Sequence, residues 1–462
     1  MRTRVIHHTP YGFPMDPNFF GQTFVIGNHT RNTGLESAVS SASGSVSVDF
    51  EDLGTQQRLA HERFRTNLLS GGLHASLKEV RHLQVSERKA ELERAATTAV
   101  SFDYFKKLLE WTNSERVAMA IHYFGAGFNG FEDLKSIFGD SVDVYLHLHC
   151  LADLFIGNLA KPQLNSRQEK QRTAVNRLID RVNPYFIAVS DAVRDSFLQH
   201  GIIPEERISV VRNGVSSDLY HPVSEGEKAE FRRDLGVRAS KLVGYVGRLS
   251  RVKGCDNLLY VLKHFEKNPS DVAFVIATSG GREMDRFVEE AKREVPQMIA
   301  EDKLKFCIDV SKFTSGFYSK DDFVNTAFYH ELVDGKERER GLFVDVITKP
   351  IQPHLDVYLQ PSNSEGLPLS VLEALMSGVP VVASSVGGVP GVVGHANGSL
   401  VQVRNRKRIQ IARDFADALH YWKEHPQTKE YIETTRNHFI EAGYDAVSMA
   451  RAFDSLYTKV KP

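Results

Sequence analysis

The chain has few cysteines and no segment apolar enough to suggest a membrane span. Its 462 residues include only Cys150, Cys255 and Cys307, which are scattered and lack metal-ligand spacing. Such cysteines are typical of reduced thiols rather than of a disulfide framework or a zinc site. No stretch approaches the roughly 20 apolar residues of a membrane-spanning helix. The first residues also lack the apolar run of a signal peptide. We therefore expect a cytoplasmic protein.

An excess of charge of either sign is also missing. The chain has 57 Lys and Arg residues against 58 Asp and Glu residues, a formal net charge of −1. This balance gives no overall basic field to attract nucleic acid or an anionic membrane. Low-complexity segments and repeats of solenoid period are absent as well, which excludes a repeat protein. The length and ordinary composition predict a globular chain of two or three domains.

Strand-like and helix-like segments alternate along both halves of the chain. Apolar runs that qualify as strands lie at residues 117–124, 142–149, 185–190, 241–246, 271–278, 355–360 and 380–383. The alternation predicts α/β domains in which helices cover both faces of a parallel sheet. A polar, turn-rich segment at residues 220–227 separates the halves, and we place the domain boundary there.

Two glutamates occupy a setting suited to a nucleotide. Pro368 fits the first turn of a helix, which places Glu365 in the loop before that helix and Glu373 inside it. A helix start offers free N–H groups and a positive dipole end, both favourable for a diphosphate. One carboxylate can then bind sugar hydroxyls and the other a ribose. The alternative is a capped helix with two solvated glutamates.

A basic loop follows the strand candidate at residues 241–246. It runs from Gly247 to Gly254 and contains Arg248 and Lys253. Ligands of open α/β sheets bind at the carboxyl ends of the strands, where this loop lies. A planar guanidinium and a point-charge ammonium together suit a leaving diphosphate. The alternative is a solvated basic loop.

Together these segments resemble the family-4 group of retaining glycosyltransferases, known as glycosyl transferases group 1. Five segments match in the right order: 188–192, 211–215 with 220–222, 247–254, the pair Glu365 and Glu373 with seven residues between them, and 386–390. The resemblance implies the GT-B fold, an α/β architecture of two Rossmann-like domains facing a central cleft. Residues 1–222 would bind the acceptor and residues 223–438 the nucleotide sugar, while residues 439–462 would form a helix crossing back to the first domain.

The resemblance also implies roles for individual residues. Arg248 and Lys253 would neutralise the leaving diphosphate, Glu365 would hold the donor sugar and Glu373 the ribose. His149 matches the active-site histidine and completes the catalytic set with Arg248, Lys253 and Glu365. His147 lies on the same strand face, so the assignment can slip by two residues. The remaining donor-binding positions are Gly21, Gly247, Gly366, Leu367, Pro368 and Leu369.

The sequence departs from the family pattern at several places. Gly21 is followed by Gln22 where two glycines are usual, and Gly391 replaces a common glutamate. The stretch from Lys312 to Pro353 is longer than usual, although the base-binding loop falls there in chain order. This stretch is either a surface insertion on the second domain or a wall and flap of the donor pocket.

The implied activity is sugar transfer, with retention of configuration, from a nucleoside-diphosphate sugar to a small soluble acceptor. UDP is favoured over GDP as the donor nucleotide. No Asp-x-Asp motif accompanies the site, so we expect no metal and no cofactor. Nucleic acid and membrane partners are not expected. Two alternatives remain: a membrane-surface transferase acting on a lipid-linked acceptor, and a non-catalytic GT-B protein that binds a partner.

Overall fold

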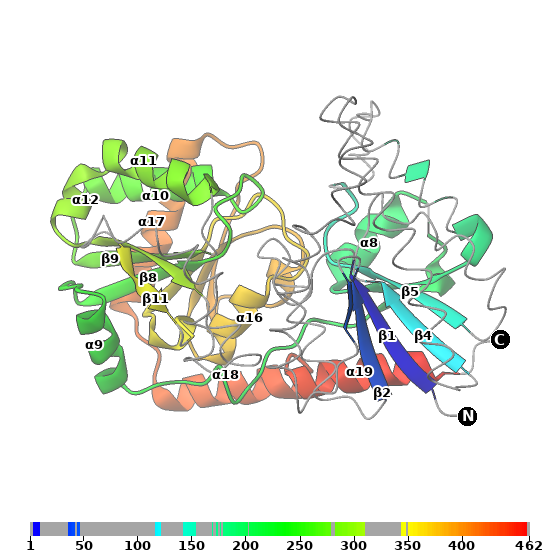
Figure 1. The fold of residues 1–462 in the computed structure, drawn as a ribbon. Helices are drawn as coiled ribbons and strands as arrows, with labels where there is room; N and C mark the ends of the chain where they lie inside the picture. Colours follow the sequence, from blue (N-terminus) through cyan, green and yellow to red (C-terminus); the bar gives the residue numbers. More distant parts are fainter. Residues whose placement is uncertain are drawn as a thin grey trace. The chain divides into compact units, whose positions relative to one another are not determined.

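The chain forms two compact units. Unit 1 comprises residues 1–212 and 449–462, and unit 2 comprises residues 213–448. The sequence placed these divisions after residues 222 and 438. The computed structural model (Figure 1) describes residues 3–9, 36–41, 44–46, 116–121, 142–153, 181–201, 203–278, 282–309, 343–347 and 350–459, with isolated positions between 169 and 180.

Unit 1 contains a seven-stranded sheet in the order β3-β2-β1-β4-β5-β6-β7. Its strands are β1 (Thr3–Thr9), β2 (Glu36–Ser41), β3 (Gly44–Val46), β4 (Arg116–Ile121), β5 (Val142–Leu148), β6 (Tyr185–Ala188) and β7 (Ile208–Val210). All neighbouring strands are parallel except β2 and β3. Helix α8 (Asp191–Gln199) is capped by Ser190, whose side chain accepts from the Val193 N–H. The 3₁₀ turn η6 (Glu205–Arg207) precedes β7.

The C-terminal helix α19 (Ala446–Thr458) runs from unit 2 into unit 1. Met449, Phe453 and Tyr457 are buried. A 2.8 Å hydrogen bond joins the Tyr457 hydroxyl to Nε2 of His147, and the Tyr145 hydroxyl donates to the Leu456 carbonyl over 3.1 Å. Contacts from β5 therefore fix the end of this helix.

Replacing Tyr457 with alanine should lower the free energy of unfolding of unit 1 by about 3–5 kcal/mol, because a fully buried aromatic ring would leave a cavity. Thermal or urea denaturation measures the change. Ser455 is exposed on the same helix, so Ser455→Ala is the matched control and should change stability by less than about 0.5 kcal/mol. Equal stability of the two variants would show that the contact with β5 contributes nothing.

Unit 2 contains a second seven-stranded sheet, in the order β11-β10-β9-β8-β12-β13-β14. Its strands are β8 (Lys241–Val246), β9 (Val272–Thr278), β10 (Leu304–Asp309), β11 (Phe343–Ile347), β12 (Val357–Gln360), β13 (Val381–Ser384) and β14 (Gly398–Val401). Every neighbouring pair is parallel. The order reverses between β8 and β12. Such a reversal is the point where open α/β sheets bind ligands.

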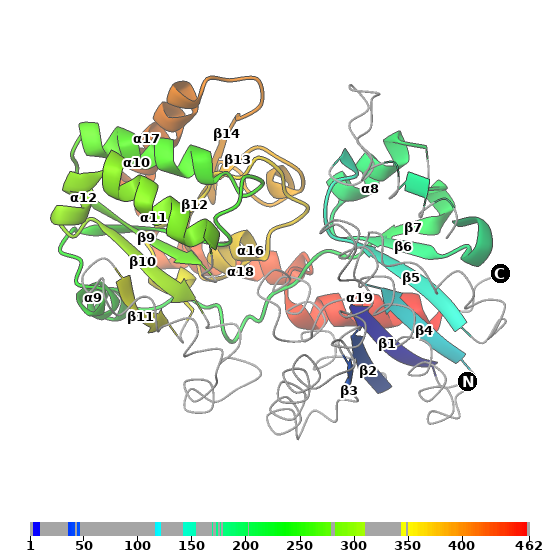
Figure 2. The same cartoon turned by 45° about the horizontal axis from the view of Figure 1, so that its top comes forward.

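Helices cover both faces of this sheet (Figures 1 and 2). One face carries α10 (Cys255–Lys267), α11 (Arg282–Glu294), α12 (Pro296–Ala300) and α17 (Arg408–Glu424). The other carries α9 (Glu225–Asp234), α16 (Leu369–Met376) and α18 (Lys429–Glu441), with the 3₁₀ turn η8 (Gln352–His354) against α9 and α16. A further 3₁₀ turn, η9 (Val389–Gly391), follows β13. The α/β class and the parallel sheets predicted from the sequence are confirmed.

Candidate functional site

Loops from three strands meet where the order of the unit 2 sheet reverses. The N–H groups of Asn363 and Ser364, in the loop after β12, donate to the Val252 carbonyl in the loop after β8. The Gly388 N–H, in the loop after β13, donates to the Gly366 carbonyl over 2.8 Å. These bonds make one continuous rim at the carboxyl ends of β8, β12 and β13.

Two glycines allow the loops to approach this closely. Gly254 and Gly387 have φ values of 72° and 54°, a region that favours glycine. A Cβ on Gly254 would lie 1.8 Å from the Pro361 carbonyl oxygen, and a Cβ on Gly387 would lie 1.7 Å from that of Glu365. Both distances are far below van der Waals contact, so any side chain would push the loops apart.

The rim encloses an ion pair between Lys253 and Glu365. The Lys253 Nζ lies 2.8 Å from Oε1 and 2.7 Å from Oε2 of Glu365. The carboxylate side chain is 4% exposed, whereas that of the lysine is 25% exposed. The sequence assigned the lysine to the diphosphate and the glutamate to the sugar. In the structure the two groups bond each other, so each compensates the charge of the other.

Polar residues that the sequence analysis did not single out surround the same carboxylate. Ser362 Oγ donates to Glu365 Oε1 over 2.7 Å, and Gln360 Nε2 donates to the same oxygen over 3.0 Å. Gln360 ends a strand that is otherwise apolar, and Ser362 lies two residues further on. In the sequence, this part of the site was indicated only by a polar side chain at the carboxyl end of a buried strand.

Arg248 is exposed at the start of the loop after β8. Its carbonyl accepts a 2.6 Å hydrogen bond from the Tyr245 hydroxyl, which fixes the loop backbone while leaving the guanidinium at the surface. Burial raises the pKa of Tyr245 well above its ordinary value, so the phenol stays protonated and remains a donor. Gly247 lies between these two residues. Its backbone N–H donates to the Ala277 carbonyl on β9, which ties the loop to the sheet.

Glu373 lies on the buried face of α16 and has no exposed surface. Its Oε2 accepts a 2.6 Å hydrogen bond from Gln352 Nε2, in the turn before β12. A ribose could reach this carboxylate only if Gln352 and its surroundings moved. The proline predicted in the first turn of this helix, Pro368, is instead the N-cap residue, and Leu369 is the first helical residue. Leu367, just before it, is anchored through its carbonyl by Asn213 Nδ2 at 2.7 Å.

In unit 1 the two candidate histidines differ in their surroundings. His147 is buried against α19 and bonded to Tyr457. His149 follows β5 directly and is half-buried. Desolvation lowers the pKa of His149 to about 4, so its imidazole is neutral at physiological pH and suited to hydrogen bonding rather than to charge neutralisation.

Some predicted features lie outside the described residues. Gly21 is one of them, and so is most of the stretch from Lys312 to Pro353. Within that stretch, β11 forms the edge of the unit 2 sheet beside β10, and Gln352 contacts Glu373. These parts of the insertion therefore belong to the packed second unit. Its aromatic and charged middle lies outside the described residues.

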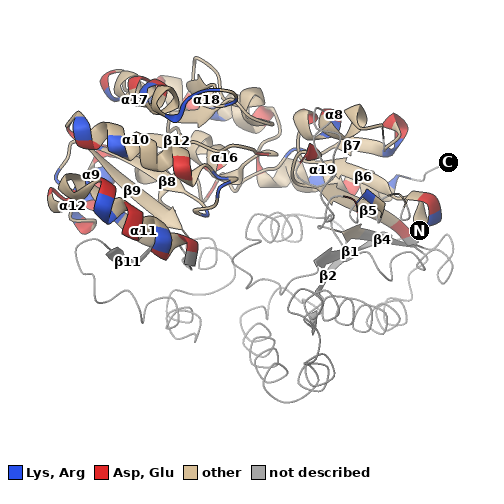
Figure 3. Cartoon of the chain, turned by 90° about the horizontal axis from the view of Figure 1, so that it is seen from above, with Lys and Arg blue, Asp and Glu red and all other residues tan. Residues whose placement is uncertain are grey.

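Charged side chains lie mainly on the helices rather than on the strands of unit 2 (Figure 3).

In the described part of the chain, no group of three or more His, Cys, Asp and Glu side chains is arranged to hold a metal ion. The same part includes no helix with the length and apolar character to cross a membrane.

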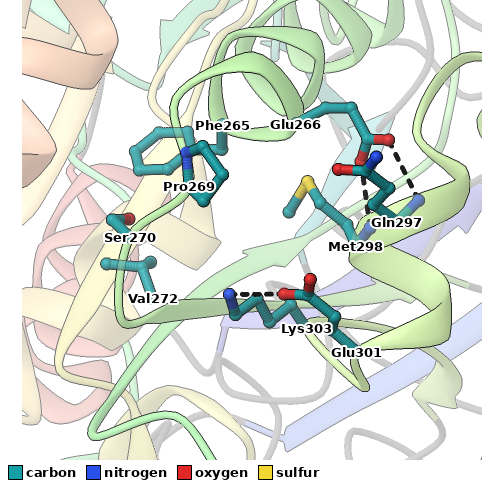
Figure 4. A pocket seen from close by; sticks show the side chains of 9 residues that line it. All are labelled: Phe265, Glu266, Pro269, Ser270, Val272, Gln297, Met298, Glu301 and Lys303. Carbon is teal, nitrogen blue, oxygen red and sulfur yellow. Dashed lines mark hydrogen bonds and ion pairs between the residues drawn. The ribbon is translucent and has the colours of Figure 1, made fainter.

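A small hollow lies away from this rim (Figure 4), where α10 and α12 meet the amino end of β9. Its volume of about 10 Å³ is enough for about one water. The Glu266 carboxylate beside it accepts from the N–H groups of Gln297 and Met298, both at 2.9 Å, and so caps α12. These contacts explain the hollow as part of helix packing, and it is too small for a nucleotide.

Comparison with known proteins identifies sequences and structures that are similar to this chain. Residues 351–446 match the family described as glycosyl transferases group 1. The chain is 26% identical over 264 residues to a D-inositol 3-phosphate glycosyltransferase of Corynebacterium aurimucosum, covering 54% of this chain and 51% of that protein. It is 27% identical over 209 residues to an alpha-maltose-1-phosphate synthase of Mycolicibacterium smegmatis, covering 45% of each. The chain thus spans about half the length of these curated relatives.

Solved structures share the fold over the full chain. The Anabaena protein HepE, crystallised with UDP, superposes with a TM-score of 0.61 at 16% identity and covers 100% of both chains. Sucrose-phosphate synthase from Thermosynechococcus elongatus superposes with a TM-score of 0.61 at 15% identity, covering 99% of this chain and 98% of that one. The predicted GT-B fold is therefore confirmed.

Proposed function

We propose that this chain transfers a sugar from a nucleoside-diphosphate sugar to a small acceptor. The match of residues 351–446 to the family described as glycosyl transferases group 1 supports this proposal. The observation that carries the proposal is the Lys253–Glu365 pair, held between the loops of β8 and β12 where the sheet order reverses. This position is the one at which an α/β sheet offers loops and a helix N-terminus to a phosphate-bearing ligand.

The proposed chemistry is charge stabilisation and positioning. The Arg248 guanidinium and the Lys253 ammonium stabilise the negative charge that develops on the leaving diphosphate. The Lys253 side chain then exchanges the Glu365 carboxylate for phosphate oxygens, and Glu365 accepts hydrogen bonds from the sugar hydroxyls. The acceptor attacks the face that the diphosphate leaves and gives its proton to a departing phosphate oxygen, so the anomeric configuration is retained. His149, in the first unit, is proposed to be the fourth member of the catalytic set.

The donor and the acceptor are proposed from the relatives. UDP is the nucleotide named in the Anabaena complex, and the Corynebacterium relative is named for a small phosphorylated acceptor. We propose UDP as the donor nucleotide, a small soluble molecule as the acceptor, and a cytoplasmic location. Arg248 and Lys253 are proposed to neutralise the diphosphate, so the reaction is proposed to need neither a metal ion nor a cofactor. A lipid-linked acceptor would instead give transfer that depends on vesicles.

The two glutamates test the proposal because their substitution should have different effects. Glu373→Gln should weaken the binding of UDP by about 1.5–3 kcal/mol, because a charged acceptor for the ribose is lost. Glu365→Gln should leave the affinity for UDP nearly unchanged and lower the turnover of the intact donor. Calorimetry with UDP and GDP, followed by a transfer assay with the matching UDP-sugars, separates the two effects.

Glu373 is fully buried, so the expected loss of UDP affinity requires the ribose to reach a carboxylate that Gln352 now contacts. If neither nucleotide binds the unsubstituted protein, the proposed function is wrong. If both variants lose affinity for UDP equally, the two glutamates act as one structural unit at the start of α16, and the division of roles between ribose and sugar fails.

A further inference from the structure

A row of buried polar side chains leads from the core of unit 2 to Glu365. Tyr358, Gln360 and Ser362 alternate along the end of β12 and the residues that follow it, and they are at most 2% exposed. The Tyr358 hydroxyl lies 2.5 Å from Gln360 Oε1, and Gln360 Nε2 lies 2.6 Å from Ser362 Oγ and 3.0 Å from Glu365 Oε1. A buried polar row of this kind is costly unless its members are bonded to one another.

The chemistry of the neighbours fixes the orientation of the Gln360 amide. A carboxylate only accepts hydrogen bonds, so the NH₂ group of Gln360 must face Glu365. At the other end, Gln360 Oε1 accepts from the Tyr358 hydroxyl over 2.5 Å and from the Ser370 hydroxyl over 3.4 Å. The Tyr358 hydroxyl also lies 3.1 Å from the Val246 carbonyl, but the bond to Gln360 is the shorter one. Burial raises the pKa of Tyr358 far above its ordinary value, so this phenol keeps the proton that it donates. A flipped amide would direct its oxygen at the carboxylate, so that two acceptors faced each other without a proton between them.

The two oxygens of Glu365 are therefore held differently. Oε1 accepts from Lys253, Ser362 and Gln360, whereas among the described residues the only donor to Oε2 is Lys253. If the lysine turned to a diphosphate, Oε1 would keep two neutral donors. Oε2 would lose its donor and become the oxygen that can accept from a ligand.

We propose that Gln360 is a positioning residue of the donor site: its amide holds Glu365 through Oε1, so that Lys253 can move to the diphosphate while Oε2 stays directed at the sugar. This assignment rests on the proposed function, because it gives Glu365 the sugar as its partner. Gln360 itself touches no substrate. Its effect passes through the carboxylate, and Tyr358 keeps the amide in the required orientation.

Gln360→Leu should lower kcat for the UDP-sugar on the order of 10- to 100-fold, the effect of losing a hydrogen bond to a charged group. The affinity for bare UDP should not change, because UDP lacks the donor sugar that Glu365 is proposed to bind. The matched control is Ser384→Ala, which alters a buried polar residue at the end of the neighbouring strand β13 and should leave kcat unchanged. An equal loss of UDP affinity and turnover in Gln360→Leu would overturn the positioning role.

Gln360→Glu gives a pH profile that a purely structural role would not produce. Two carboxyl groups at this distance share one proton, which raises the pKa of one of them. Below that pKa the introduced carboxyl donates to Glu365, as the amide does, and activity is kept. Above it two carboxylates repel each other and activity falls. A variant whose kcat has the same pH dependence as the unsubstituted enzyme would contradict the proposal.

A measurement without substrate separates this proposal from the proposed function. In protein labelled with ¹⁵N-glutamine, the side-chain NH₂ signals of Gln360 are identified by their loss in Gln360→Leu. Tyr358→Phe should shift these signals, whereas Ser384→Ala should not. If the Gln360 NH₂ signals do not shift in Tyr358→Phe, Tyr358 does not act on the Gln360 amide. The proposal then fails, whatever ligand the protein binds. If the row is coupled but no UDP-sugar is bound or turned over, the proposed function fails instead.

Discussion

Replacing Lys253 with alanine should lower the rate of sugar transfer by about 100-fold or more, the usual effect of removing one preorganised group that stabilises developing charge. It should also lower the free energy of unfolding by about 3 kcal/mol, because a buried carboxylate would lose its counter-charge. This estimate takes the low end of the usual range, since Gln360 and Ser362 still donate to Glu365. A transfer assay and thermal denaturation measure the two losses.

Two further variants separate catalysis from stability at this position. In Lys253→Ala combined with Glu365→Gln the buried charge is gone, so stability should recover while transfer stays low. Arg248→Ala should impair transfer with no loss of stability, because its guanidinium is exposed and has no acidic partner in the part of the chain that the structure describes. Near-normal turnover in Lys253→Ala would remove the lysine from the proposed mechanism.

Gly387→Ala should strongly impair both stability and transfer, although it adds only a methyl group. A left-handed backbone costs a residue with a Cβ about 1–2 kcal/mol, and displacing the Glu365 backbone adds to this, so we expect about 2–4 kcal/mol of destabilisation. Because Glu365 itself is pushed, transfer should fall about 100-fold, the effect of misplacing a reacting group by about 1 Å. Denaturation and steady-state kinetics check the two losses.

The matched control for this substitution is Gly391→Ala, four residues along the same loop. A Cβ there would meet nothing within 4 Å, so stability and transfer should stay near those of the unsubstituted protein. If Gly387→Ala behaves like Gly391→Ala, the close approach of the loop to Glu365 plays no part in shaping the site.

Strong local patterns allowed the α/β class and several strands to be predicted. The run from Lys241 to Val246 is a strand over the predicted residues, and β9 and β13 lie within one residue of theirs. Short or mixed strands were missed. The strand β10 contains the buried Lys305, whose ammonium bonds Asp302 at 2.5 Å. Such a pairing depends on packing and leaves no apolar run in the sequence.

The sequence by itself determined which loops form the candidate site. A basic, glycine-bounded loop after one strand and a glutamate before a helix after another are local patterns, and each is formed by neighbours in the chain. The tertiary structure decided how these loops meet. Lys253 and Glu365 are 112 residues apart, and they pair because β8 and β12 are neighbours where the sheet order reverses.

The same dependence on strand order governs the rest of the site. The sequence shows Gln360 only as the polar residue at the end of a strand. Its hydrogen bonds to Tyr358 and Glu365 are seen only in the structure. The sequence predicts that the Glu373 carboxylate faces a ligand, whereas the structure shows it buried and bonded to Gln352. Local pattern sets the type of each element and the residues at its ends. The pairing of buried charges is a property of side chains brought together by non-local contacts, so only the tertiary structure decides it.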